Sequence, residues 1–178
     1  FINLNKKIWK KKAIIILPII ISFLFLLLFI YTAYKFRIER GTAGMLFVLG
    51  VCVFSDIGGY IIGKSIGGKK LTKISPNKTI SGSFGSFLFS LFPLGILMIS
   101  SLQLNFQEFN PSDKHILYCL LISLSCQLGD LIISYFKRLA KVKDTGKILP
   151  GHGGMLDRID GVIFAIPTTI LIIHPLVF

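Results

Sequence analysis

The sequence predicts an all-α integral membrane protein, a polytopic bundle of about five transmembrane helices with its polar loops in the cytoplasm. Hydrophobic residues make up 53% of the 178 residues, above the roughly 45–50% apolar content of soluble domains. The mean hydropathy is +0.75. The apolar residues also cluster into long runs instead of alternating, which is typical of membrane-spanning helices.

The first run, residues 13–34, is nearly all Ile, Leu and Phe and reaches the roughly 20 residues that cross a hydrocarbon core. Lysines precede it, as in a signal peptide, but its apolar core exceeds an h-region of about 7–15 residues and no small-residue cleavage site follows. The four further runs of spanning length are residues 42–63, 84–102, 115–136 and 161–178. We therefore expect residues 1–178 to form a single transmembrane domain.

The basic residues, which give a net charge of +12, lie in the gaps between these runs. Five lysines precede the first span, five lie between Lys64 and Lys78, and six basic residues lie between Lys137 and Arg158. With five spans these segments share one side, so the positive-inside rule places the N-terminus and both long loops in the cytoplasm. No DNA- or RNA-binding motif accompanies the charge, so we expect no nucleic-acid partner.

Three cysteines, Cys52, Cys119 and Cys126, fall inside predicted spans and lack C-x-x-C spacing. Neither a disulfide framework nor a zinc site is implied by this pattern. Free cysteines are commonly buried, so we expect packing residues.

Asp56 lies within the second predicted span, where an ionisable side chain is costly and is by default a functional candidate. The alternative is a carboxylate that snorkels or is paired for packing. On a helix, Asp56, Gly59, Tyr60 and Gly63 share one face by their spacing. The carboxylate should therefore face a partner across small residues.

A second polar stripe runs along the fourth predicted span into a loop that is dense in charge and glycine. The stripe consists of Gln127, Asp130, Ser134 and Lys137. A loop that only fixed topology would need Lys and Arg but no carboxylates. Carboxylates hold a hard divalent cation, basic side chains neutralise phosphate oxygens, and glycines let backbone N–H groups approach an anion. The pattern therefore predicts phosphoryl chemistry on a nucleotide.

Residues 58–65 read Gly-Gly-Tyr-Ile-Ile-Gly-Lys-Ser, which fits the Walker A pattern G-x-x-x-x-G-K-S. A P-loop needs a strand before it and alternating β and α units after it. This chain has long apolar runs there, so we do not expect a P-loop.

The stretch Ser134-x-x-Lys137-Arg138-x4-Lys143-Asp144-x-Gly146-x2-Leu149-Pro150-x-His152-Gly153-Gly154-x2-Asp157-Arg158-x-Asp160 resembles the signature of the phosphatidate cytidylyltransferase (CDP-diacylglycerol synthase) family. Similar blocks precede it at residues 56–60, 63–64, 74–79 and 127–130. The resemblance covers the chain from Asp56 onward. It implies transfer of a cytidylyl group from CTP to phosphatidic acid, with CDP-diacylglycerol and pyrophosphate as products.

The resemblance and the chemistry of these residues together imply three sets of site residues. The catalytic candidates are Asp130, Asp144, Asp157, Lys137, Arg138, Lys143 and His152. The substrate-binding candidates are Asp56, Lys64, Ser75, Lys78, Ser134, Gly151, Gly153, Gly154 and Arg158. The candidate Mg²⁺ ligands are Asp130, Asp157, Asp144 and Asp160. Two points stay open: whether His152 is a general base, a hydrogen-bond donor to phosphate or a residue that shapes the loop, and whether a monovalent cation joins Mg²⁺.

Family members usually have a longer N-terminal region with more spans, and Trp-Glu-Gly where this chain has Ile80-Ser81-Gly82. A compact homologue and a fragment are both open. Two other functions also stay open: a CTP-using enzyme that acts on an archaeol-type lipid or a polyprenol, and an anion or phosphate transporter. We expect a bacterial inner-membrane protein whose active site faces the cytoplasm, and a homodimer is compatible with the sequence.

Overall fold

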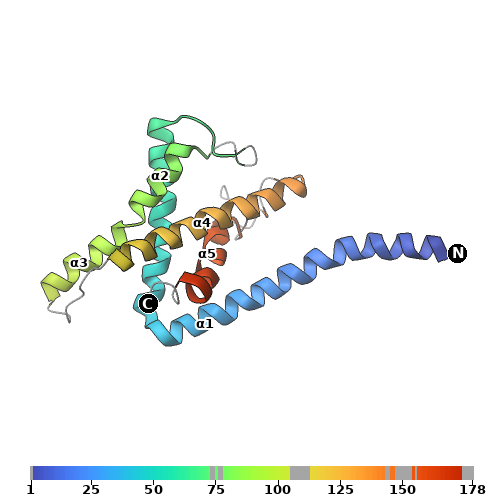
Figure 1. The fold of residues 1–178 in the computed structure, drawn as a ribbon, viewed down its shortest axis with the longest axis horizontal. Helices are drawn as coiled ribbons and strands as arrows, with labels where there is room; N and C mark the ends of the chain where they lie inside the picture. Colours follow the sequence, from blue (N-terminus) through green and yellow to red (C-terminus); the bar gives the residue numbers. More distant parts are fainter. Residues whose placement is uncertain are drawn as a thin grey trace.

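The computed structural model describes residues 2–72, 75, 78–104, 113–142, 145–146, 154 and 156–173. These form α1 (Ile2–Ile66), α2 (Ile80–Phe89), α3 (Phe92–Leu104), α4 (Asp113–Leu139) and α5 (Leu156–Thr168), which a π-helical turn (Thr169–Ile173) extends (Figure 1). Within the described residues, β-pairing is limited to one isolated bridge between Lys70 and Thr79. The predicted all-α fold is confirmed.

Helix α1 contains the first two predicted spans, joined by a kink at Gly41. Gly41 has φ 68° and ψ −170°, a conformation that residues with a Cβ rarely adopt. In Figure 1 the N-terminal end of α1 projects away from the other helices, whereas the part after the kink runs beside α2. Between these two parts, Phe25 of α1 packs against Phe164 of α5. The link predicted between the two spans is itself helical up to Gly41.

The third predicted span, residues 84–102, is interrupted in the structure. Helix α2 ends at Phe89, a turn follows at Ser90 and Leu91, and α3 begins at Phe92. Pro93 lies in the first turn of α3, where a proline is tolerated because its missing N–H has no helical partner there. If α2 and α3 were one continuous helix, Pro93 would lie in its interior and the proline ring would clash with a preceding carbonyl.

The fourth predicted span, residues 115–136, lies within α4. The fifth, residues 161–178, corresponds to α5 and the π-helical turn as far as residue 173, and residues 174–178 are outside the described part of the chain. Among the described residues, three segments are long and apolar enough to cross a membrane: 17–66, 80–99 and 113–139. Residues 159–171 form a shorter apolar helix, so the count of five spans stays a prediction.

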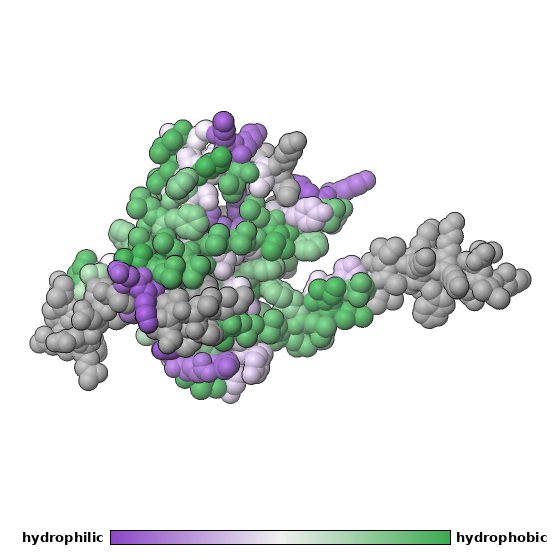
Figure 2. All heavy atoms as spheres, in the orientation of Figure 1, coloured by the Kyte–Doolittle hydropathy of each residue, from purple (hydrophilic) through white to green (hydrophobic). Residues whose placement is uncertain are grey.

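The core lies where α1, α4 and α5 meet. Fully buried side chains there include Val51 and Cys52 of α1, Ile122 and Cys126 of α4, and Ala165 of α5. Cys119 is also buried, so the prediction that all three cysteines are packing residues is confirmed. Outside this core, large apolar side chains are exposed along α1 and α4, as Figure 2 shows by the green helix surfaces. Such surfaces suit contact with lipid chains.

Glycines hold α1 and α2 in close contact. A Cβ added to Gly58 would lie 2.5 Å from the carbonyl oxygen of Gly85, and one added to Gly85 would lie 2.6 Å from the carbonyl oxygen of Gly58. Small residues let helix backbones approach in this way. Residues 58–65, which match the Walker A pattern, are helical throughout, so the prediction that they do not form a P-loop is confirmed.

Candidate active site

A cavity of about 310 Å³ lies between α1, α2, α4 and the loop that joins α1 to α2. It falls at the small end of the roughly 300–1,000 Å³ that ligand pockets occupy. Most of its lining residues are polar or small: Asp56, Gly59, Tyr60, Leu71, Ser75, Lys78, Thr79, Gly82, Ser83, Ser86, Gln127 and Asp130. The cavity therefore brings together four of the site residues predicted from the sequence, Asp56, Ser75, Lys78 and Asp130.

Lys78 and Asp130 form an ion pair in which the Lys78 Nζ donates a hydrogen bond to Asp130 Oδ2. The two side chains are 30% and 22% exposed. An ion pair this sheltered is screened less by water and salt than a surface pair. The pair joins the residue before the N-cap of α2 to the second half of α4.

The position of Lys78 is determined by the loop that precedes α2. Gly67 and Gly68 have positive φ values of 64° and 106°, which turn the chain back after α1. The backbone N–H of Leu71 then donates to the carbonyl of Lys78 over 2.8 Å. Thr79 caps α2 by accepting a hydrogen bond from the backbone N–H of Gly82 at 3.0 Å. Lys78 therefore stands immediately before a capped helix end.

Ser81 is the residue at which the chain departs from the acidic residue usual in the resembled family. Its hydroxyl donates to the carbonyl oxygen of Gly67 and lies 3.0 Å from Thr79 Oγ1. These contacts close the loop against the first turn of α2. Ser81 therefore has a structural role here.

Two further charged residues extend the Lys78–Asp130 pair. The carboxyl groups of Asp130 and Asp160 lie close enough to interact, and Lys137 Nζ lies 3.8 Å from Asp160 Oδ2. The Lys137 and Asp160 side chains are only 15% and 13% exposed. We call these four residues, Lys78, Asp130, Lys137 and Asp160, the charged cluster. It joins the entrance of α2, the second half of α4 and the start of α5.

Asp56 reaches the same cavity from α1, near enough to Asp130 and Lys78 for their charges to interact. Asp56 of α1 and Asp130 of α4 thus line the cavity, and Asp160 of α5 lies next to Asp130. Among the described residues, however, no three Asp, Glu, His or Cys side chains are close enough together to form a metal site. Asp130 and Asp160 are the two predicted metal ligands that the structure brings into contact.

The remaining predicted site residues are only partly described. Ser134 lies half-buried on α4, one turn beyond Asp130, and Arg138 is exposed in the last turn of that helix. Lys64 is exposed near the end of α1, with its Nζ 3.4 Å from Tyr60 Oη. Gly154 is buried against Thr145 and Gly146. Lys143, Asp144, Gly151, His152 and Gly153, with the side chains of Asp157 and Arg158, lie outside the described part of the chain.

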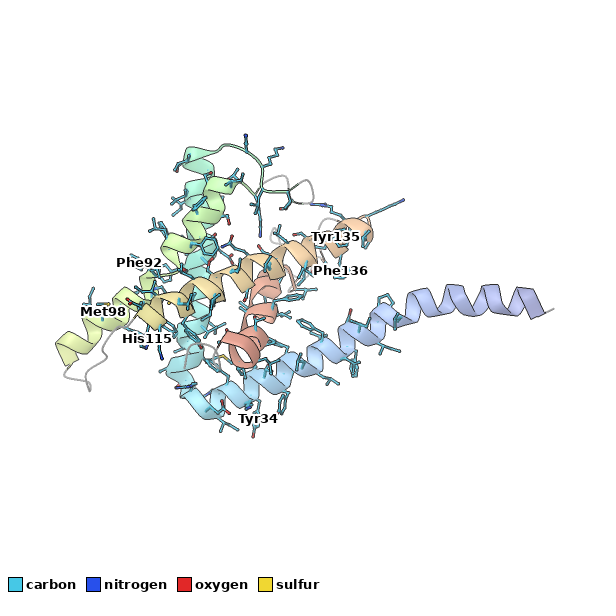
Figure 3. All side chains as sticks on the ribbon, in the orientation of Figure 1. Tyr34, Phe92, Met98, His115, Tyr135 and Phe136 are labelled. Carbon is cyan, nitrogen blue, oxygen red and sulfur yellow. The ribbon has the colours of Figure 1, made fainter. Side chains whose placement is uncertain are left out.

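The charged cluster lies toward the C-terminal end of α4. In Figure 3, Tyr135 and Phe136 mark this end and His115 marks the other. His115 and Asp130 are separated by about 22 Å, at roughly 1.5 Å per helical residue. His115 is therefore remote from the cavity.

Three cavity residues, Ser83, Ser86 and Thr79, were not assigned a role by the sequence. They lie in or next to the run of small and apolar residues from Ile80 to Phe89, where serine gives no distinctive signal. Gln127 did carry a signal, because it shares the polar stripe of α4 with Asp130. Its contacts with Ser83 and Ser123 could be known only from the packing of the helices.

Comparisons with known proteins identify the family of the chain. The cytidylyltransferase family model matches residues 1–176. A Staphylococcus epidermidis protein named phosphatidate cytidylyltransferase is 44% identical over 136 residues, which cover 75% of this chain and 50% of that protein. A Bacillus subtilis protein of the same name is 41% identical over 128 residues, covering 70% and 46% respectively. A Staphylococcus aureus protein of that name is 44% identical over 137 residues, covering 75% and 50%.

The chain spans about half the length of these curated relatives. The family match nevertheless extends over nearly all of the chain and includes every segment that builds the cavity and the charged cluster. The chain belongs to the cytidylyltransferase family.

Proposed function

We propose that the protein transfers the cytidylyl group of CTP to phosphatidic acid, giving CDP-diacylglycerol and pyrophosphate. The observation that carries this proposal is the charged cluster beside a polar cavity, in a chain of the cytidylyltransferase family. Its similarity to bacterial proteins named phosphatidate cytidylyltransferase supports the choice of substrates.

The reaction needs positioning and charge neutralisation more than it needs an activated side chain. The phosphate of phosphatidic acid is already a nucleophile at neutral pH, and it attacks the α-phosphorus of CTP while pyrophosphate leaves. Lys78 and Lys137 supply positive charge on two sides of the cluster. Fixed cations of this kind stabilise negative charge as it develops in a phosphoryl transition state.

Two members of the charged cluster, Asp130 and Asp160, have the carboxylate oxygens that suit a divalent cation. Asp130 and Asp160 are in contact, and two carboxylates this close repel each other unless a proton or a cation lies between them. Mg²⁺ prefers carboxylate oxygens and usually binds through one or two of them. We propose that Asp130 and Asp160 hold Mg²⁺, with Asp144 and Asp157 as the further predicted ligands. The ion would supply charge neutralisation at the phosphate oxygens.

The arrangement of the loops supports a site on one face of the membrane. The α1–α2 loop, the C-terminal end of α4 and the start of α5 all meet at the charged cluster. The distribution of Lys and Arg predicts a cytoplasmic location for the α1–α2 loop and for the loop between α4 and α5. We propose that the site faces the cytoplasm of a bacterial cell at its inner membrane.

A proteoliposome assay tests the activity. Vesicles that contain the protein and phosphatidic acid should convert labelled CTP to labelled CDP-diacylglycerol and release pyrophosphate without an ion gradient. Asp130→Asn vesicles serve as the control and should show almost no product. If the wild-type protein made product only with a polyprenyl phosphate, the acceptor would be wrong. If it moved phosphate across the vesicle and made no pyrophosphate, the enzymatic function would be refuted.

A further inference from the structure

We infer that Ser123 and Gln127 are positioning residues, which act through hydrogen bonds to Ser55 and Ser83 to hold Lys78 and Asp130 in contact. The catalytic consequence of this inference rests on the proposed function, but the geometric part does not. We call the four residues Ser55, Ser123, Gln127 and Ser83 the polar chain.

The polar chain crosses three helices. Ser55 of α1 and Ser123 of α4 are fully buried, and their hydroxyl oxygens are 2.7 Å apart. Gln127, one turn further along α4, donates from Nε2 to the Ser123 hydroxyl over 3.2 Å. Ser83 of α2 donates to Gln127 Oε1 over 2.5 Å. The chain therefore runs from the buried interior of the bundle to the wall of the cavity.

The donors and acceptors of the polar chain are mutually consistent. Ser83 donates to Gln127, and Gln127 donates to Ser123, so the hydrogen of the Ser123 hydroxyl is available for Ser55. A buried polar group that loses its partner in such a site costs about 1–3 kcal/mol. Hydrogen bonds also gain strength where water is excluded. We therefore expect the hydrogen bond between Ser55 and Ser123 to resist separation of α1 from α4.

The polar chain and the ion pair form two parallel connections between α2 and α4. The two α4 residues are close in sequence, because Gln127 lies three residues before Asp130. Their partners are also close, because Lys78 precedes the N-cap of α2 and Ser83 lies five residues after Lys78. Both connections therefore set the position of α2 along α4. The contact of α2 with α1 is made largely by glycines, which allow close approach but give little directional restraint.

A purely structural role for the polar chain would predict a different result. Loss of a packing hydrogen bond would lower thermal stability and leave the folded molecules with an unchanged site. A positioning role predicts a changed Lys78–Asp130 contact in molecules that remain folded. Ser125 provides the matched control, because it lies on the same helix and its hydroxyl donates instead to the carbonyl of Leu121 at 2.9 Å.

The test is carbodiimide crosslinking of the full chain in membranes, since this reagent joins an amine and a carboxylate only when they are in contact. The yield of the Lys78–Asp130 crosslink, measured by mass spectrometry of folded protein, should fall about fivefold in Ser123→Ala and in Gln127→Met. It should stay at the wild-type level in Ser125→Ala and recover in Ser123→Thr. Ser55→Ala combined with Ser123→Ala should lose no more than Ser123→Ala alone, because Ser123→Ala already removes the hydrogen bond between the two hydroxyls.

The same membranes give a kinetic readout. In Ser123→Ala, kcat per folded molecule should fall about tenfold, which corresponds to about 1.4 kcal/mol, with the KM for phosphatidic acid changed less than twofold. Equal crosslink yields in Ser123→Ala and Ser125→Ala would refute the positioning role. If wild-type protein crosslinks as expected but makes no CDP-diacylglycerol, the proposed function fails while the positioning of Lys78 against Asp130 stands.

Discussion

Lys78 and Asp130 are 52 residues apart in sequence, yet the Lys78 ammonium donates a hydrogen bond to the Asp130 carboxylate across the candidate active site. The pair joins the capped start of α2 to the second half of α4. Asp130 also contacts Asp160 at the start of α5. One carboxylate thereby connects three elements of the site.

Replacement of Lys78 by Met should lower kcat/KM for CTP by at least about 100-fold, the scale seen when one stabilising donor is removed from a transition state. The change removes the ammonium group that pairs with Asp130 and so lowers the positive charge of the cavity. The control is Lys35→Met, because Lys35 pairs with Glu39 at 3.7 Å on an exposed helix face, where an ion pair contributes little. The turnover of labelled CTP in membranes measures the activity of both variants. Equal activity in the two variants would contradict a role for Lys78 in the site.

Asp160→Asn should raise the Mg²⁺ concentration for half-maximal rate about tenfold or more, on the scale reported for changes around metal ligands. The substitution removes one of the two carboxylates in contact and leaves Asp130 alone. Chelation of divalent cations should abolish wild-type turnover. Asp113→Asn, an exposed change in the first turn of α4, is the control. An unchanged Mg²⁺ requirement in Asp160→Asn would remove Asp160 from the proposed ligand set.

Gly85→Ala should destabilise the protein by about 1–3 kcal/mol, the usual cost of overpacking. Its Cβ would lie 2.6 Å from the carbonyl oxygen of Gly58 and 2.6 Å from the Cβ of Ile62, so α2 would have to move away from α1. Gly95→Ala is the control because a Cβ there has nothing within 4 Å, and alanine favours the helix by about 0.5–1 kcal/mol. Thermal unfolding in detergent compares the stability of the two variants. A Gly85→Ala variant more stable than the wild type would disprove the close packing of α2 against α1.

The three cysteines should resist alkylation while the protein is folded. Cys52, Cys119 and Cys126 are at most 1% exposed, so a maleimide cannot reach their sulfur atoms. Lys69→Cys, in the exposed loop before α2, should react within minutes and serve as the positive control. Mass measurement after labelling counts the modified thiols. Modification of any native cysteine before unfolding would show that the bundle core is open.

The sequence predicted most of the helices because long apolar runs need no knowledge of their neighbours to be recognised. It missed the break at Ser90 and Leu91, since a turn of two residues barely changes the mean hydropathy of its run. It predicted Asp56, Lys78, Asp130, Lys137 and Asp160 as site residues. The structure places the first three on the cavity, and Asp160, paired with Lys137, next to Asp130. It assigned no role to Ser55, Ser83 or Ser123, because a serine in an apolar run can equally face a neighbouring helix or bond to its own backbone.

The sequence by itself determined that this chain is a helical membrane protein, because unpaired backbone in lipid is so costly that long apolar runs must be helical. It also predicted which charged residues form the candidate site, because charge within a span is costly and points to a function. Only the tertiary structure decided which charges are partners. The pairing of Lys78 with Asp130, and of Asp130 with Asp160, depends on how closely α1 approaches α2 through Gly58 and Gly85 and on how α5 lies against α4. Helix periodicity identifies the face of a side chain but not the neighbour that the face will meet.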